Sequence, residues 1–145
     1  MQPLNLTARH QNDRYKYRHS GRLFADTTTN FDCFVSRAFL VIQTERINQK
    51  YLTGLLNSKL VAFWFRRKGK MQGNAYQLDK EPLLEIPVYK PADKDANEIA
   101  KLVGKIISLK QQGKDSNENE RKIDELVYKL YNLTSAEIKV VENSI

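Results

Sequence analysis

Residues 54–88 read GLLNSKLVAFWFRRKGKMQGNAYQLDKEPLLEIPV, and this stretch decides how the chain is interpreted. It begins with apolar residues at helical spacing and reaches three consecutive cations, Arg66, Arg67 and Lys68. A polar loop punctuated by glycines follows, and it carries Lys70, Gln72, Asn74 and Gln77. We therefore expect a buried helix that presents a cationic, amide-rich loop, an arrangement suited to holding nucleic acid.

The apolar part predicts one helix from Asn48 to Lys68. Asn48 has an N-cap side chain, and Gly69 is a natural stop after the last turn. Between them, apolar residues recur at helical spacing: Leu52, Leu55, Leu56, Leu60, Phe63 and Trp64. Cations in a last turn interact favourably with the helix dipole, so a purely structural role for Arg66, Arg67 and Lys68 stays open.

Upstream, the chain predicts strands. Residues 31–44 are rich in β-branched and aromatic side chains, which favours a buried strand. Aromatic and basic residues alternate from Tyr15 to Arg18, so a strand would place Lys16 and Arg18 on one face. Those cations could meet phosphate, or they could simply be the solvated face of a half-buried strand.

Downstream of Pro91 the pattern becomes helical. Caps are expected at Asp95, Asn117 and Thr134, each followed three residues later by Glu. Two apolar stripes, of residues 99–109 and 123–130, predict an antiparallel helical hairpin, and a short helix is expected from Ser135 to about Glu142. With the upstream strands, this predicts an α+β fold: a small, mostly antiparallel sheet packed on the central helix, with a C-terminal antiparallel helical hairpin.

Charge divides the chain in the same way. The 145 residues carry a net charge of +7, but residues 1–80 hold 14 Lys and Arg against 5 Asp and Glu, and the remainder is slightly acidic. We expect a DNA-binding α+β part over residues 1–91, truncated at its N-terminus, and a helical part over residues 92–145. The basic half predicts a polyanionic partner, most simply nucleic acid.

Several kinds of chemistry are missing from the sequence. There is no P-loop, no dinucleotide-binding glycine motif and no nucleophile elbow. His10 and His19 stand alone, and Asp79, Glu81 and Glu85 are better explained as capping and first-turn residues than as metal ligands. A lone Cys33, the absence of a long uncharged apolar run and an N-terminus without an apolar signal core predict a cytoplasmic protein without a membrane partner. The chain is expected to be a binding module rather than an enzyme.

The run from Leu55 to Val88 resembles the TaqI-like C-terminal specificity domain of type II (type IIG) restriction-modification enzymes and adenine-specific DNA methyltransferases. Four pieces carry the resemblance: Leu56-Asn57-Ser58-Lys59, the loop 68–74, Tyr76-Gln77 and the close at Leu84–Pro87. The tail Lys122–Val141 is similar to the ending of the same enzymes. The Asn-Pro-Pro-Tyr and cofactor-binding glycine motifs of those methyltransferases are both missing here.

The resemblance implies a target recognition domain that docks on double-stranded DNA. A methyltransferase domain, in the same chain or a partner chain, would bind S-adenosylmethionine and act on adenine, so no cofactor or metal is expected in this chain. The cations expected to contact DNA are Arg14, Lys16, Arg18, Arg22, Arg66, Arg67, Lys68 and Lys70.

Gln72, Asn74 and Gln77 are candidate base readers, because an amide can pair bidentately with adenine. The alternative for Gln72 and Asn74 is that they only shape a turn. The alternative for the whole chain is a non-specific DNA clamp and interaction module that docks on a methyltransferase or translocase.

Overall fold

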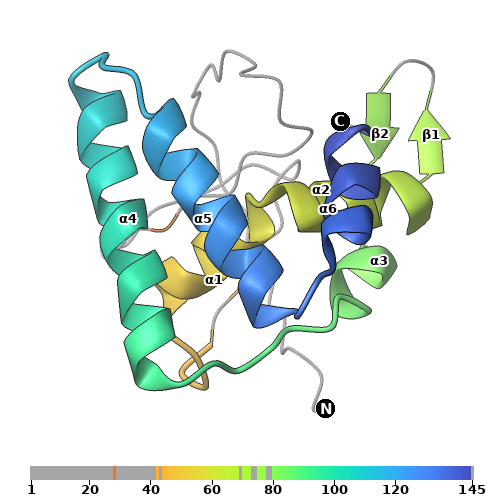
Figure 1. The fold of residues 1–145 in the computed structure, drawn as a ribbon, viewed down its shortest axis with the longest axis horizontal. Helices are drawn as coiled ribbons and strands as arrows, with labels where there is room; N and C mark the ends of the chain where they lie inside the picture. Colours follow the sequence, from red (N-terminus) through yellow and green to blue (C-terminus); the bar gives the residue numbers. More distant parts are fainter. Residues whose placement is uncertain are drawn as a thin grey trace, which may run out of the picture.

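The computed structural model describes residues 28, 42, 44–68, 70–72, 75–77 and 80–144. Most of these lie in helices, which are labelled in Figure 1. The helices are α1 (Gln49–Leu56), α2 (Lys59–Lys68), α3 (Lys80–Leu84), α4 (Asp93–Gln111), α5 (Asn117–Leu130) and α6 (Ser135–Glu142). Two short strands, β1 (Lys70–Gln72) and β2 (Ala75–Gln77), follow α2.

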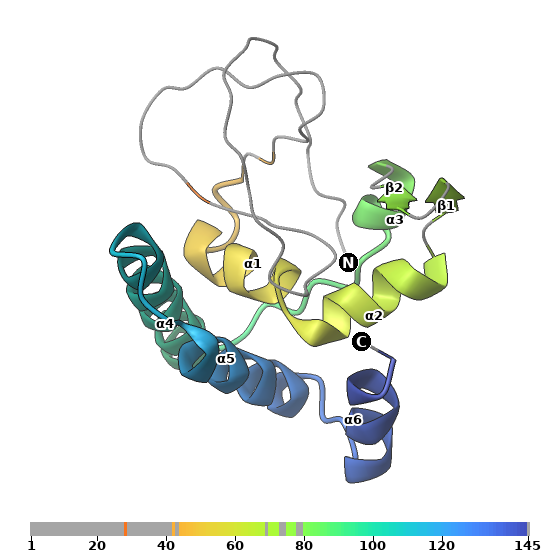
Figure 2. The same cartoon turned by 90° about the horizontal axis from the view of Figure 1, so that it is seen from above.

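The helices form two layers that share one core. Figure 2 shows α1 and α2 in one layer and α4, α5 and α6 in the other. Helix α1 packs mainly on α4, whereas α2 packs on α5 and α6. Tyr51, Leu55, Ile99 and Val127 are fully buried where the layers meet. The core therefore joins residues on both sides of residue 91, and the division of the chain at that point stays a prediction.

The prediction of an α+β fold is wrong. In the part of the chain that the structure describes, helices cover α1 and α2, and the only strands are the three-residue β1 and β2 at the end of α2. The apolar stripe of α4 supplies Ile99 and Val103, which lie directly on Gly54 of α1, so helix packing fills the place assigned to a sheet. The strand expected over residues 31–44 lies outside the described residues, except at 42 and 44.

The prediction of one continuous helix from Asn48 to Lys68 also needs correction, because the chain breaks at Asn57 and Ser58. The Asn57 amide donates to the carbonyl of Thr53 at 2.9 Å and so competes for a backbone acceptor of α1. The buried Ser58 hydroxyl donates to a carbonyl of α1 and accepts an N–H of α2. Asp124 of α5 then accepts the backbone N–H of Lys59 at 2.8 Å, which caps the new helix.

The helices of the C-terminal segment are found where the sequence placed them, but two of the expected caps are not. Helix α4 starts before Asp95, after Ala92, with no side-chain cap. Helix α5 has Ser116 as its N-cap instead of Asn117. Thr134 and Glu137 do form the predicted capping box of α6.

Two tyrosine hydroxyls hold the segment between α3 and α4. The Tyr51 hydroxyl donates to the carbonyl of Tyr89, and the Tyr131 hydroxyl donates to the carbonyl of Pro87, each at 2.7 Å. Burial raises the pKa of Tyr51 and of Tyr131, so both hydroxyls stay protonated and keep donating. Helix α3, which precedes this segment, contacts α2 directly.

Candidate nucleic-acid interface

The sequence-predicted site residues are only partly within the structure's described residues. Arg66, Arg67 and Lys68 occupy the last turn of α2, as expected. The backbones of Lys70, Gln72 and Gln77 lie in β1 and β2. The remaining candidates, Arg14, Lys16, Arg18, Arg22 and Asn74, lie outside the described residues. The structure thus brings together a cationic helix end and the hairpin that follows it.

Two of the α2 cations lie over aromatic rings of the preceding turn. The Arg67 guanidinium is 5.2 Å from the ring centre of Phe63, and the Lys68 ammonium is 5.5 Å from that of Trp64. Each pair is four residues apart, the spacing that stacks side chains on one helical face. Both distances fall within the range of cation–π attraction. The rings therefore hold two exposed charges close to the helix surface.

Helix α3 fixes one of these rings and adds a carboxylate. The Trp64 indole N–H donates to the carbonyl of Pro82 at 3.3 Å. Glu85, which directly follows α3, lies 3.5 Å from the Lys68 ammonium. Lys68 therefore has an aromatic ring and a carboxylate as neighbours. The sequence interpretation missed the role of Glu85, because nothing in the linear pattern indicates that α3 folds back onto α2.

Arg66 differs from its two neighbours because one nitrogen atom of its guanidinium is buried and has no hydrogen-bond partner among the described residues. This atom is Nε, and it is out of contact with solvent. A buried donor left without an acceptor costs about 1–3 kcal/mol. Phosphate and carboxylate oxygens are the acceptors that a guanidinium prefers.

The hairpin register places the polar residues of the loop together. Lys70 pairs with Gln77, Met71 with Tyr76 and Gln72 with Ala75 in an antiparallel ladder. Directly opposed residues share a face and neighbours along a strand alternate, so Lys70, Gln72 and Gln77 occupy positions on one face of the hairpin. Figure 1 shows the hairpin standing at the outer end of α2.

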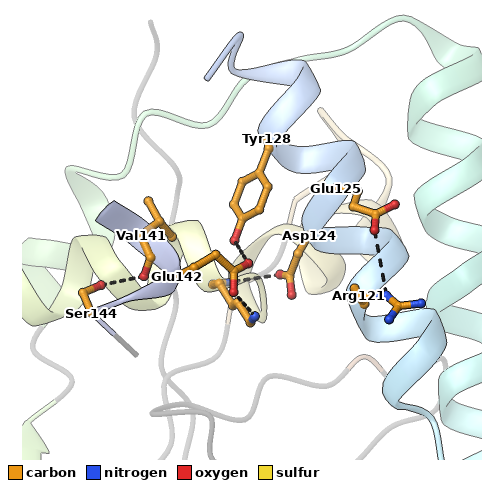
Figure 3. Close-up of polar contacts among 8 residues, drawn as sticks. Arg121, Asp124, Glu125, Tyr128, Val141, Glu142 and Ser144 are labelled. Carbon is orange, nitrogen blue, oxygen red and sulfur yellow. Dashed lines mark hydrogen bonds and ion pairs between the residues drawn. The ribbon is translucent and has the colours of Figure 1, made fainter. Parts of the chain in front are cut away.

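The other end of α2 borders a cleft of a different character. The cleft, of about 710 Å³, lies between the start of α2, α5 and α6. Figure 3 shows Tyr128 pointing toward Glu142, which also pairs with Lys59. Burial opposes ionisation of Glu142, but hydrogen bonds from Lys59 and Tyr128 outweigh it and lower the pKa of this carboxyl. Cations and carboxylates balance around the cleft, so it does not suit a polyanion: Lys59, Arg121 and Lys129 face Asp124, Glu125 and Glu142.

The described residues contain neither a candidate metal site nor a candidate membrane span. In that part of the chain, no three His, Cys, Asp or Glu side chains gather in a way that could hold a metal ion. No helix in it is both long and apolar enough to cross a membrane. The cationic end of α2, with its aromatic rings and the hairpin beyond it, is the described arrangement best suited to an anionic ligand.

Just over half of the chain is similar to a known protein family. Residues 11–88, just over half of the chain, match the family model described as the TaqI-like C-terminal specificity domain. The match includes α1, α2, the hairpin and α3, and it ends before α4. No solved structure matches the chain significantly.

Two curated relatives are similar over a shorter stretch. The type II methyltransferase M.HincII of Haemophilus influenzae is 35% identical over 68 residues, which cover 43% of this chain and 14% of the relative. The type II methyltransferase M.HindII of Haemophilus influenzae strain Rd is also 35% identical over 68 residues, covering 43% of this chain and 13% of that protein. The chain thus spans about one seventh of the length of the curated relatives it matches.

Proposed function

This chain belongs to the family of TaqI-like C-terminal specificity domains, and from that premise we propose that it recognises a specific sequence in double-stranded DNA for a type II DNA methyltransferase or restriction-modification enzyme. The surface that would meet DNA is the end of α2 together with the β1–β2 hairpin. Methyl transfer to adenine, with S-adenosylmethionine as the donor, and any DNA cleavage would belong to other domains, in the same or a partner chain.

The observation that carries this proposal is the last turn of α2. It holds three cations in succession, and two of them lie over aromatic rings. The third, Arg66, has a buried Nε atom without an acceptor among the described residues. Phosphate contacts supply most of the sequence-independent affinity for DNA, and they depend on cations of this kind. Three successive cations, two of them exposed, favour an anionic ligand over a purely structural role for all three.

The hairpin supplies a candidate for reading bases. A two-stranded ribbon fits the major groove of B-DNA, where amide side chains distinguish adenine. Gln72 and Gln77 occupy the same face of the hairpin as Lys70. We assign Lys70 to phosphate and the two glutamines to base edges.

Selection from random duplexes tests the proposal directly. Immobilised protein is incubated with a library of random double-stranded DNA at about 100 mM salt, a concentration that weakens purely electrostatic binding. Enrichment of one sequence motif supports recognition. Salt-sensitive binding without an enriched motif would leave only a non-specific clamp, and no binding at low salt would refute DNA binding by this chain.

Two substitutions separate the roles within the hairpin. Lys70→Ala is expected to weaken binding to every duplex alike and to reduce the slope of log K against log salt by about 1. Gln72→Ala is expected to reduce affinity for the selected sequence by roughly ten- to a hundred-fold, with little effect on random DNA. Equal losses on both duplexes would remove Gln72 as a base reader.

A further inference from the structure

The Lys68 ammonium already has an anionic partner in the free protein. The Glu85 carboxylate lies 3.5 Å from it, and the centre of the Trp64 ring lies 5.5 Å from the same ammonium. The side chains of Lys68 and Glu85 are 52% and 58% exposed, so the pair is open to solvent and to ligands. A carboxylate at this position occupies a cation that the proposed function assigns to phosphate.

We propose that Glu85 acts as an internal competitor for Lys68 and thereby lowers the affinity of this surface for DNA of any sequence. The inference rests on the proposed function. A phosphate that approaches Lys68 must displace Glu85 or accept it as a neighbour of like charge. Either course costs binding free energy, and neither depends on which bases the duplex carries.

The size of the effect follows from the exposure of the pair. An ion pair between solvent-exposed side chains contributes little, because water and salt screen it and both side chains lose freedom. Phosphate can therefore displace Glu85, and the contact adjusts affinity without blocking the site. Removing the competing charge should strengthen binding by about two- to five-fold at low salt, the factor that an exposed pair supports.

The position of the Trp64 ring does not depend on Glu85. The indole is anchored to α3 through its hydrogen bond to Pro82, so its ring does not need the carboxylate for its position. Trp64 is also the only tryptophan in the chain. Its fluorescence therefore reports on the surroundings of the Lys68 ammonium, both before and after DNA is added.

The test compares Glu85→Gln with Glu81→Gln on the same random duplex at about 50 mM salt, where phosphate contacts are strong. Glu81 is exposed, lies one helical turn earlier in α3 and makes no ion pair with a described residue, so its substitution removes the same charge without releasing Lys68. Glu85→Gln is expected to bind two- to five-fold more tightly than Glu81→Gln, and to change the Trp64 emission of the free protein. Equal affinities for the two variants would overturn the proposal.

A second pair of variants shows whether the effect acts through Lys68. In a Lys68→Ala background, Glu85→Gln should bind no more tightly than Glu81→Gln, because the cation to be released is gone. An advantage that persists without Lys68 would refute the competition. If the unsubstituted protein binds no duplex, the proposed function fails together with this inference, whereas binding with equal variants rejects the inference alone.

Discussion

Asp124 is the side chain on which the position of α2 depends most directly. It is 2% exposed, and its Oδ1 atom accepts the backbone N–H of Lys59, the first residue of α2, at 2.8 Å. A carboxylate at a helix N-terminus satisfies a free backbone donor and interacts favourably with the helix dipole. Asp124→Ala removes this acceptor and leaves a partly buried N–H without its partner.

We expect Asp124→Ala to lower the free energy of unfolding by about 1–2 kcal/mol, the cost of losing an N-cap acceptor. Asp124→Asn keeps an oxygen acceptor and should lose less. Glu125→Ala is the matched control, because Glu125 is the next residue of α5 and its side chain is 68% exposed. Urea unfolding followed by the fluorescence of Trp64, which lies in α2 itself, gives all three values.

The same variants also differ in the DNA binding that we expect of them. Because Asp124 holds the start of α2 and the cations lie at its other end, Asp124→Ala should weaken DNA binding only when unfolded protein accumulates. A loss of stability within about 0.5 kcal/mol of that of Glu125→Ala, the usual range for surface substitutions, would refute the assigned role of Asp124.

Two further predictions follow from packing and capping. Gly54→Ala should destabilise the protein by about 1–3 kcal/mol, because the added methyl group would lie 2.6 Å from Ile99. At Gly104 an added methyl group meets no atom closer than 4.0 Å, so Gly104→Ala should be neutral or stabilising by up to about 1 kcal/mol. The same urea experiment measures both values. Hydrogen bonds from the backbone and side chain of Thr134 lower the pKa of Glu137 from its ordinary value of 4.5. The stability that this carboxylate adds should therefore be complete above pH 4.5 and should disappear as the pH falls through the folded-state pKa. Melting temperatures of the unsubstituted protein and Glu137→Gln should therefore converge in acid, and a constant difference at every pH would contradict the capping assignment.

Local patterns predicted the helices well and the fold class poorly. The stripes of α4 and α5 and the capping box of α6 depend on residues three or four apart, which are neighbours on any helix. The cations of α2 were also found where the sequence placed them, because a last turn and the glycine after it are local features. Whether Arg66 has an acceptor depends instead on how α2 is buried, and no local pattern shows that.

The break between α1 and α2 shows, within a single segment, the same difference between local patterns and contacts that depend on the fold. Apolar spacing continued through Asn57 and Ser58, so the pattern favoured one long helix. The two side chains compete for backbone groups in any context, but their competition prevails here because Asp124, 65 residues beyond Lys59, caps the new helix end. A contact at that separation in the chain exists only after α5 has packed.

The sequence by itself determined the family, the positions of most described helices and the cationic character of the segment that follows Phe65. These depend on residue types and on short spacings, which the chain carries before it folds. Only the tertiary structure decided that, within the described part of the chain, helices rather than a sheet pack on α1 and α2. It also decided that Asp124 caps the start of α2 and that Glu85 lies against Lys68. Each of these depends on which distant surfaces meet, and that is fixed by the burial of apolar area across the whole core.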